Sequence, residues 1–210
     1  MEQENPKKLD RTVTIFVSVV VIIFIGVILY LSFGKGSITA GTVLSEDHFL
    51  YKGEYEVTRV DPITYIIKGF IGEQPINIHL RTDPRNVENI PSESDIKTKL
   101  IPSKEIFITA NPNLTSNTLI AAVEISKITG NPSLFNIQTQ GALTKTVGNS
   151  TLPIKTCKEA TKESKVILLQ LADETKIHSE GNCIIIDGET QDDLIRAADK
   201  LVLQLLEIIK

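Results

Sequence analysis

The chain has 210 residues, a formal net charge of −4 and a charged fraction of 23%. This mildly acidic balance lacks the basic surface that binding to phosphate backbones requires, so we expect no nucleic acid partner. Tryptophan is absent and aromatic residues make up 5% of the chain, which argues against a carbohydrate-stacking surface or a large aromatic pocket.

A long apolar run near the N-terminus predicts a transmembrane helix. The run from Thr12 to Phe33 contains no charged side chain. At about 1.5 Å rise per residue, a helix of this length spans a hydrocarbon core of about 30 Å. Helix is the expected state because lipid offers backbone groups no hydrogen-bond partners. The sequence therefore predicts a single contact with the lipid bilayer, through this signal-anchor helix.

Two other interpretations of the apolar run agree less well with the sequence. A cleaved signal peptide would have a shorter apolar region, of about 7–15 residues, followed by small residues at the cleavage site. Cleavage after Ala40 would place Ile38 where a small residue is expected, and no cysteine follows for a lipoprotein. A pilin-like precursor would carry a glycine just before the run and a glutamate near its start, and neither is present.

The flanking basic residues predict the orientation in the membrane. Lys7, Lys8 and Arg11 precede the run, whereas only Lys35 and then Lys52 follow it within reach. Since positive residues favour the cytoplasmic side, we expect a cytoplasmic tail at 1–11, the membrane helix at 12–33 and a stalk at 34–41. The remaining C-terminal domain is then extracytoplasmic, at the cell membrane surface.

The section 42–102 is predicted to be β-rich. Strands are expected at 42–51, 55–60, 63–70 and 75–80, forming three or four antiparallel strands. They are separated by turn signals at Lys52-Gly53, Asp61-Pro62 and Gly72-Glu73. The polar segment 81–103 contains Pro84, Pro91 and Pro102. We expect it to be a loop with room for one helical turn and to separate two subdomains.

The section 103–210 is predicted to be mixed α/β. Strands are expected at 105–109, 134–140, 152–156, 165–171, 176–179 and 183–187, with the continuously apolar 165–171 as a central strand. A helix is expected at 116–129, well buried because its apolar residues surround most of its axis. The fold class is therefore α+β, with one hairpin around Gly181.

A long amphipathic helix is predicted at the C-terminus. Thr190 and Asp193 have the spacing of a capping box. Apolar residues are expected to line one face of the helix, on a sheet, and polar residues the opposite one: Arg196, Asp199, Lys200, Gln204 and Glu207.

The predicted exported domain contains two cysteines and two N-glycosylation sequons. An even cysteine count in an oxidising compartment indicates a disulfide between Cys157 and Cys183, with two unlinked, packed cysteines as the alternative. Asn113 and Asn149 each begin an Asn-X-Ser/Thr triplet in a predicted loop and are candidate N-glycosylation sites.

Three sequence blocks resemble a group of small, uncharacterised, membrane-anchored proteins of archaea. They run from Cys183 to Leu201, from Thr156 to Ala160 and from Arg81 to Pro91. The resemblance implies an archaeal cell-surface location and brings no catalytic residue or cofactor with it.

The sequence contains no recognisable catalytic, cofactor-binding or metal-binding motif. His48, His79 and His178 lie in or beside predicted strands, and none has a convincing ligand partner. Even Glu46-Asp47-His48 cannot converge on a metal from a strand, because adjacent residues point to opposite faces. We expect His178 to face solvent and the segment Asp83 to Arg85 to be an ordinary surface loop.

The sequence therefore predicts a non-enzymatic surface protein that binds a partner protein or a component of the cell envelope. One alternative is an extracytoplasmic hydrolase that uses a serine with His79 or His178 and a carboxylate. Another is an accessory subunit of a membrane transport or secretion complex.

Overall fold

The computed structural model describes residues 45–71 and 73–209. The predicted cytoplasmic tail, membrane helix and stalk lie outside these residues. Within the described ranges, no helix has the length and apolarity needed to cross a membrane. The described part belongs to one compact unit that starts at Leu44, and its α+β class agrees with the prediction.

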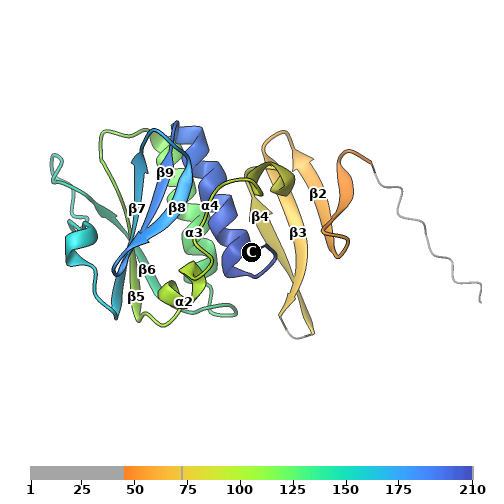
Figure 1. The fold of residues 1–210 in the computed structure, drawn as a ribbon, viewed down its shortest axis with the longest axis horizontal. Coiled ribbons are helices and arrows are strands. Elements are labelled where there is room, and N and C mark those ends of the chain that lie inside the picture. Colours follow the sequence, from red (N-terminus) through yellow and green to blue (C-terminus); the bar gives the residue numbers. More distant parts are fainter. Residues whose placement is uncertain (1–44, 72, 210) are drawn as a thin grey trace, which may run out of the picture. The chain divides into compact units, whose positions relative to one another are not determined.

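The first half forms a four-stranded antiparallel sheet in the order β1-β2-β3-β4 (Figure 1). Its strands are β1 (His48–Tyr51), β2 (Tyr55–Asp61), β3 (Thr64–Ile71) and β4 (Gln74–Leu80). Lys52 and Gly53 both have positive φ in the β1–β2 turn, as the turn signal there predicts. The first strand is shorter than expected because Ser45 and His48 already close a turn.

The segment between the two sheets forms short helices and an extended stretch that pairs with β8. It contains the 3₁₀ helix η1 (Pro84–Val87) and the helix α2 (Ile96–Leu100). Between them, the Ile177 N–H donates to the Pro91 carbonyl at 2.8 Å, and the Glu93 N–H donates to the Ile177 carbonyl at 3.2 Å. The expected loop with a helical turn is therefore present, and it also covers the outer edge of the second sheet.

The second half forms a five-stranded sheet in the order β6-β5-β7-β9-β8, with β7 at its centre as predicted. The four strands from β6 to β9 in this order are parallel, and β8 pairs antiparallel with β9. The bounds are β5 (Glu105–Ala110), β6 (Gln138–Leu143), β7 (Ser164–Leu171), β8 (Lys176–Glu180) and β9 (Cys183–Gly188). A 3₁₀ helix η2 (Cys157–Glu159) precedes β7.

Two helices, α3 (Ser116–Thr129) and α4 (Gln191–Leu205), lie between the sheets in Figure 1. One hydrophobic core joins side chains of both sheets and both helices, among them Ile67, Leu80, Ile125, Ile167 and Leu201. A smaller core on the opposite face of the second sheet contains Phe107, Ala142, Val166, Cys183 and Ile185.

Burial of α4 on two sides corrects one prediction. The capping box of Thr190 and Asp193 is present. However, Asp199, Lys200 and Gln204, which were expected on a solvated face, are each less than 5% exposed. The reason is that α4 contacts β9 and β7 on one side and η1 on the other, so its polar stripe meets the segment that follows β4.

Three other local predictions are wrong. Residues 134–137 are not a strand, because Asn136 takes a positive φ of 51° and the chain extends only from Gln138. Residues 152–156 contribute an isolated bridge between Leu143 and Ile154 in place of a strand. Helix α3 has the expected bounds, yet Leu119 and Val123 are 65% and 41% exposed.

Candidate binding site

A pocket of about 450 Å³ lies where the parallel strands β5 and β6 end and α3 begins. Ile108, Ala110 and Leu143 line it from the strands. Leu119 and Ala122 line it from α3. In open α/β sheets, ligands bind outside the carboxyl ends of the strands. The topology therefore places this pocket where such a fold offers a site.

Apolar side chains surround this pocket and remain exposed. Leu119, Val147 and Leu152 line it, and their exposed fractions are 65%, 44% and 48%. Val123 follows Leu119 by one turn of α3 and is 41% exposed. Scattered exposed apolar residues are ordinary, but a contiguous group around a hollow is typical of an interaction site.

The polar rim of the pocket joins the N-termini of the two helices. Gln191 Oε1 accepts from both the N–H and the hydroxyl of Thr115, each at 2.6 Å. Next to this pair, Asn117 Nδ2 donates to Asp192 Oδ1 at 2.7 Å. These bonds fix the start of α3 against the start of α4, so the rim is held in place by the fold itself.

The outer wall of the pocket belongs to a strap, which we define as residues 144–163 between β6 and β7. Val147, Ser150 and Leu152 of the strap line the pocket. The Leu143 N–H donates to the Pro153 carbonyl, and the Lys155 N–H donates to the Leu143 carbonyl, both at 2.9 Å. The strap is thereby attached to the edge of the sheet at the end of β6.

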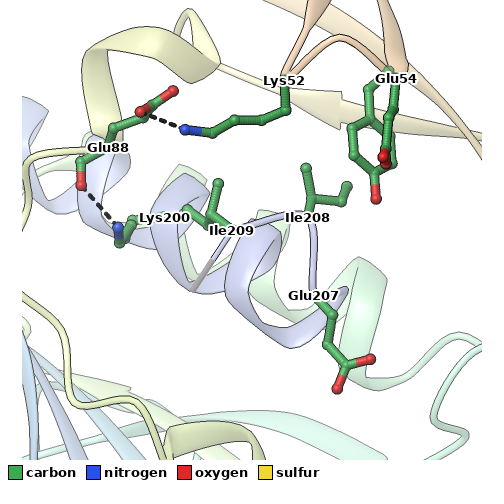
Figure 2. A pocket seen from close by; sticks show the side chains of 8 residues that line it. Lys52, Glu54, Glu88, Lys200, Glu207, Ile208 and Ile209 are labelled. Atoms are coloured by element: carbon green, nitrogen blue, oxygen red, sulfur yellow. Dashed lines mark hydrogen bonds and ion pairs between the residues drawn. The ribbon is translucent and has the colours of Figure 1, made fainter.

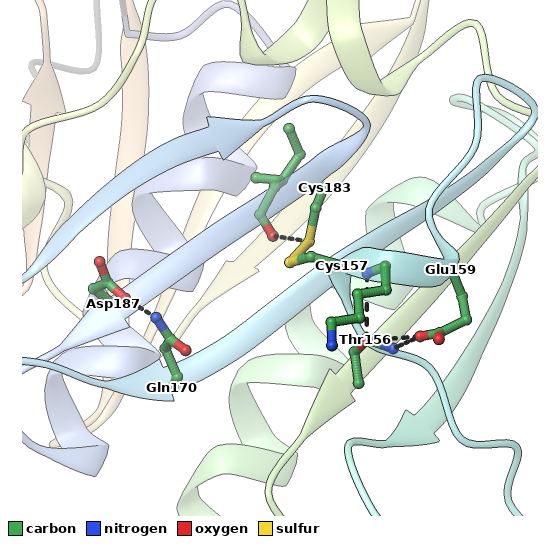
Figure 3. Close-up of a disulfide and its surroundings, with 8 residues drawn as sticks. Thr156, Cys157, Glu159, Gln170, Cys183 and Asp187 are labelled. Atoms are coloured by element: carbon green, nitrogen blue, oxygen red, sulfur yellow. Dashed lines mark hydrogen bonds between the residues drawn. A yellow bond between two sulfur atoms is a disulfide. The ribbon is translucent and has the colours of Figure 1, made fainter.

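A disulfide fastens the far end of the strap. Cys157 is bonded to Cys183, the first residue of β9, as the cysteine count predicts (Figure 3). Thr156 and Glu159 form a capping box around η2 beside this bond. Since Cys183 is fully buried in the smaller core, the disulfide attaches the strap to a packed residue of the sheet.

The two candidate glycosylation sites lie near the same pocket. Asn113 is exposed in the β5–α3 loop, next to the lining residue Leu114. Asn149 is exposed in the strap, next to the lining residue Ser150. Both sequons occupy loops, and their modification stays a prediction.

A second pocket, of about 470 Å³, is lined by charged side chains, of which Lys52 and Glu88 form an ion pair (Figure 2). Lys52 Nζ lies 2.7 Å from Glu88 Oε2, and this contact lowers the pKa of Glu88. The Lys200 ammonium donates to the Glu88 carbonyl at 2.9 Å, and burial lowers the pKa of Lys200. Through Glu88, these contacts join the turn after β1 to α4, so we assign this pocket a structural role.

His178 is half-buried and paired, with 27% of its side chain exposed, whereas the prediction placed it facing solvent. Its Nε2 lies 3.0 Å from Asp187 Oδ2, and Gln170 Nε2 donates to the other oxygen of Asp187 at 2.9 Å. A histidine paired with a buried carboxylate is one part of a hydrolase triad. In the described ranges no serine or threonine hydroxyl is hydrogen-bonded to His178. The histidine and the carboxylate are therefore present without the nucleophile that a triad needs.

The other predicted hydrolase histidine, His79, is exposed on β4, and no hydrogen bond of its ring is found among the described residues. His48 contacts Glu56 at 3.0 Å and Thr58 at 3.1 Å within the first sheet. The described ranges contain no group of three potential metal ligands. The structure thus brings neither histidine into the apolar pocket.

A serine beside a lysine also proves to be structural. Ser179 Oγ lies 2.6 Å from Lys99 Nζ and 2.5 Å from Glu93 Oε2. A lysine that activates a serine needs a lowered pKa. Here the contacts with Glu93 and Asp95 raise the pKa of Lys99, so it stays charged. The cluster fastens α2 and the 91–93 segment to β8.

The loop that begins at Asp83 is folded onto itself. Asp83 accepts from the Arg85 side chain, and the Arg85 guanidinium lies 3.9 Å from the centre of the Phe49 ring. These contacts occupy both charged groups. The segment is not the expected ordinary surface loop, because Asp83 and Pro84 are buried and Pro84 begins η1, which packs against α4.

Sequence reasoning missed the apolar pocket. Leu119 and Val123 look like core residues on the helical pattern, and only the exposure of that face shows otherwise. Comparison with protein-family models, with curated proteins and with solved structures gives no match.

Proposed function

We propose that this chain is a single-pass, membrane-anchored, extracytoplasmic protein whose folded domain binds a protein partner at the cell envelope. The observation that carries the binding role is the apolar pocket bordered by Leu119, Val147 and Leu152. Burying apolar area contributes roughly 25 cal/mol per Å², so covering these three side chains would favour association.

The position of the pocket supports a role in recognition. It lies at the carboxyl ends of the parallel strands, where connecting loops rather than the core decide what is bound. Its wall is the strap, which the Cys157–Cys183 disulfide holds at one end. A preformed wall lowers the ordering cost of binding, because fewer residues must lose freedom when the partner arrives.

The disulfide and the apolar run support the extracytoplasmic location. Disulfides persist in oxidising compartments and are rare in the cytoplasm. The uncharged run from Thr12 to Phe33 has the length of a membrane helix, and Lys7, Lys8 and Arg11 precede it. A domain placed outside would meet other envelope proteins within the plane of the membrane.

Site-specific photo-crosslinking in intact membranes tests the binding role. A benzophenone side chain would replace Leu119 in one variant of the full chain and Ile63 in the other. Ile63 is the matched control because it is 64% exposed, against 65% for Leu119, and lies in the β2–β3 turn. We expect an adduct with a second protein from position 119 and none from position 63. No adduct at 119, or equal yields, would remove the support for this site.

Thiol labelling tests the location separately. Intact cells would be treated with a membrane-impermeant thiol reagent before and after mild reduction. Labelling of Cys157 and Cys183 only after reduction is the expected result for an outer domain with this disulfide. If labelling requires broken membranes, the domain is cytoplasmic and the proposed location is wrong.

A further inference from the structure

A glycine in the interior of β6 forms part of the wall of the apolar pocket. Gly141 lines the pocket and pairs with Ile108 of β5, which lines it too. Leu143, two positions further along β6, is another lining residue. Alternate residues of a strand face the same side of the sheet, and so do directly paired residues. A side chain at position 141 would therefore point toward the pocket.

The usual structural reasons for a glycine in a strand do not apply to Gly141. Glycine is needed where φ is positive, and Gly141 is not among the residues with positive φ. Glycine can also mark a β-bulge, but β5 and β6 pair along their full length without a register shift. Finally, it can make room for neighbouring atoms of the same chain. Among the described residues, however, a Cβ at position 141 would meet no heavy atom within 4 Å.

The glycine of β6 is therefore unexplained by the fold of the chain itself. A glycine weakens a strand, because it loses more conformational freedom on folding and has no side chain to pack. The remaining reason for a glycine inside a strand is the close approach of a bound group. Since Gly141 is exposed and faces the pocket, such a group would reach it from the pocket.

The walls around this open space are aliphatic and uncharged. Among the described residues that line the pocket, none is charged and none is aromatic. The apolar side chains of the lining include Ile108, Leu119, Leu143, Val147 and Leu152. Such walls offer dispersion contacts to an aliphatic group. They offer no partner to a charged group, which would lose its hydration on entering, and no ring for an aromatic group to stack on.

We propose that Gly141 leaves room for an aliphatic side chain of the protein partner, a leucine, an isoleucine or a methionine, which enters the pocket over β6. This inference rests on the proposed function and adds the chemistry of the group that is bound. A few buried anchor side chains carry most of the binding energy of a protein interface. Gly141 is then a specificity-determining position, because any side chain there would occupy the space of the anchor.

Filling the space at position 141 tests the proposal in the full chain in intact membranes. The readout is the yield of the adduct from a benzophenone side chain at position 119. We expect Gly141→Leu to lower this yield by about tenfold, because the added side chain overlaps the anchor. Gln140→Leu is the matched control, because it places the same side chain on the opposite face of the same strand. That variant should keep the wild-type yield.

The outcomes of this experiment separate the inference from the proposed function. An unchanged adduct in Gly141→Leu would overturn the role of Gly141 and leave the binding surface at position 119 in place. No adduct in the wild-type background would remove the proposed function itself. Gly141→Ala should give an intermediate yield, so the test does not depend on the folding of the larger variant.

Water-soluble amino acid amides test the chemistry of the anchor. The full chain in nanodiscs would be mixed with N-acetylleucinamide, N-acetyltyrosinamide or N-acetyllysinamide, and binding would be detected by saturation-transfer NMR. We expect the strongest signal from the leucine derivative, loss of that signal in Gly141→Leu, and its retention in Gln140→Leu. A stronger signal from the tyrosine or lysine derivative, or a leucine signal that Gly141→Leu leaves unchanged, would overturn the aliphatic assignment.

Discussion

Asp199 of α4 accepts the backbone N–H of Arg81 at 2.9 Å, and this bond joins the end of the first sheet to the buried helix. The second carboxylate oxygen, Oδ1, is buried without a hydrogen-bond partner among the described residues. Beside it, the Arg81 side chain donates to Glu124 at 2.8 Å. Burial therefore raises the pKa of Asp199 to about 8.

This raised pKa predicts that the domain loses stability as pH rises toward 8. A carboxyl group that holds its proton more tightly when folded contributes stability that is complete below its unfolded pKa of about 4. The contribution decreases from there and is lost as pH passes the folded value near 8. We expect Asp199→Asn to flatten this part of the pH profile, because the amide stays neutral.

Urea denaturation of both proteins between pH 4 and pH 9 measures the effect. Asp173→Asn is the control, since Asp173 is exposed in the turn between β7 and β8. Parallel profiles for wild type and Asp199→Asn would show that Asp199 does not titrate in this range.

Glu93 should produce the opposite trend in acid. Contacts with Lys99 and then Ser179 lower its pKa to about 2. A lowered folded pKa gives stability that is present above the ordinary glutamate pKa of about 4.3 and lost as pH falls toward 2. Glu93→Gln should therefore lessen the decrease in stability between pH 4.5 and pH 2. Glu54→Gln, at an exposed position, should leave the acid profile unchanged. An unchanged acid profile for Glu93→Gln would show that the contacts of Glu93 with Lys99 and Ser179 do not stabilise the fold.

The disulfide should stabilise the domain by about 3 kcal/mol, because it closes a loop in the unfolded chain. Cys157 and Cys183 are 26 positions apart. The measurement is the urea midpoint of the wild type with and without reductant, and Cys157→Ser with Cys183→Ala should match the reduced protein. Hydrogen exchange should rise in the strap more than in α4, because reduction releases the strap alone. An unchanged midpoint would contradict this account.

Much of the fold could be predicted because its elements are locally encoded. The Thr190–Asp193 box marks the start of α4, and Gly181, with a φ of 60°, marks the β8–β9 hairpin. Burial was less predictable. Charged residues such as Lys200 and Asp199 are normally predicted on the solvated face of a helix. They are buried here because α4 packs against η1.

The candidate site could not be predicted from the sequence. Leu119 repeats the spacing of core residues, and only its 65% exposure shows that it faces the pocket at the ends of β5 and β6. The disulfide followed from composition, but its use as the attachment of a pocket wall depends on the path of residues 144–163.

Gly188 occupies the tightest backbone approach among the glycines of the described ranges. It ends β9, and a Cβ there would lie 2.7 Å from the Thr190 carbonyl oxygen and 2.8 Å from the Leu194 backbone nitrogen. Both atoms belong to the capped start of α4 and cannot move without opening the first turn. Gly188→Ala should therefore lower the free energy of unfolding by about 1–3 kcal/mol, the usual cost of overpacking.

Gly141→Ala is the matched control for this substitution. The new methyl group would meet nothing within 4 Å, and the backbone there needs no positive φ. Reduced freedom of the unfolded chain should leave this variant equal to wild type or more stable by about 0.4–1 kcal/mol. Urea denaturation of the two variants gives the comparison. A loss of stability at position 141 equal to that at 188 would show that the cost comes from losing glycine in a strand and not from the contact with α4.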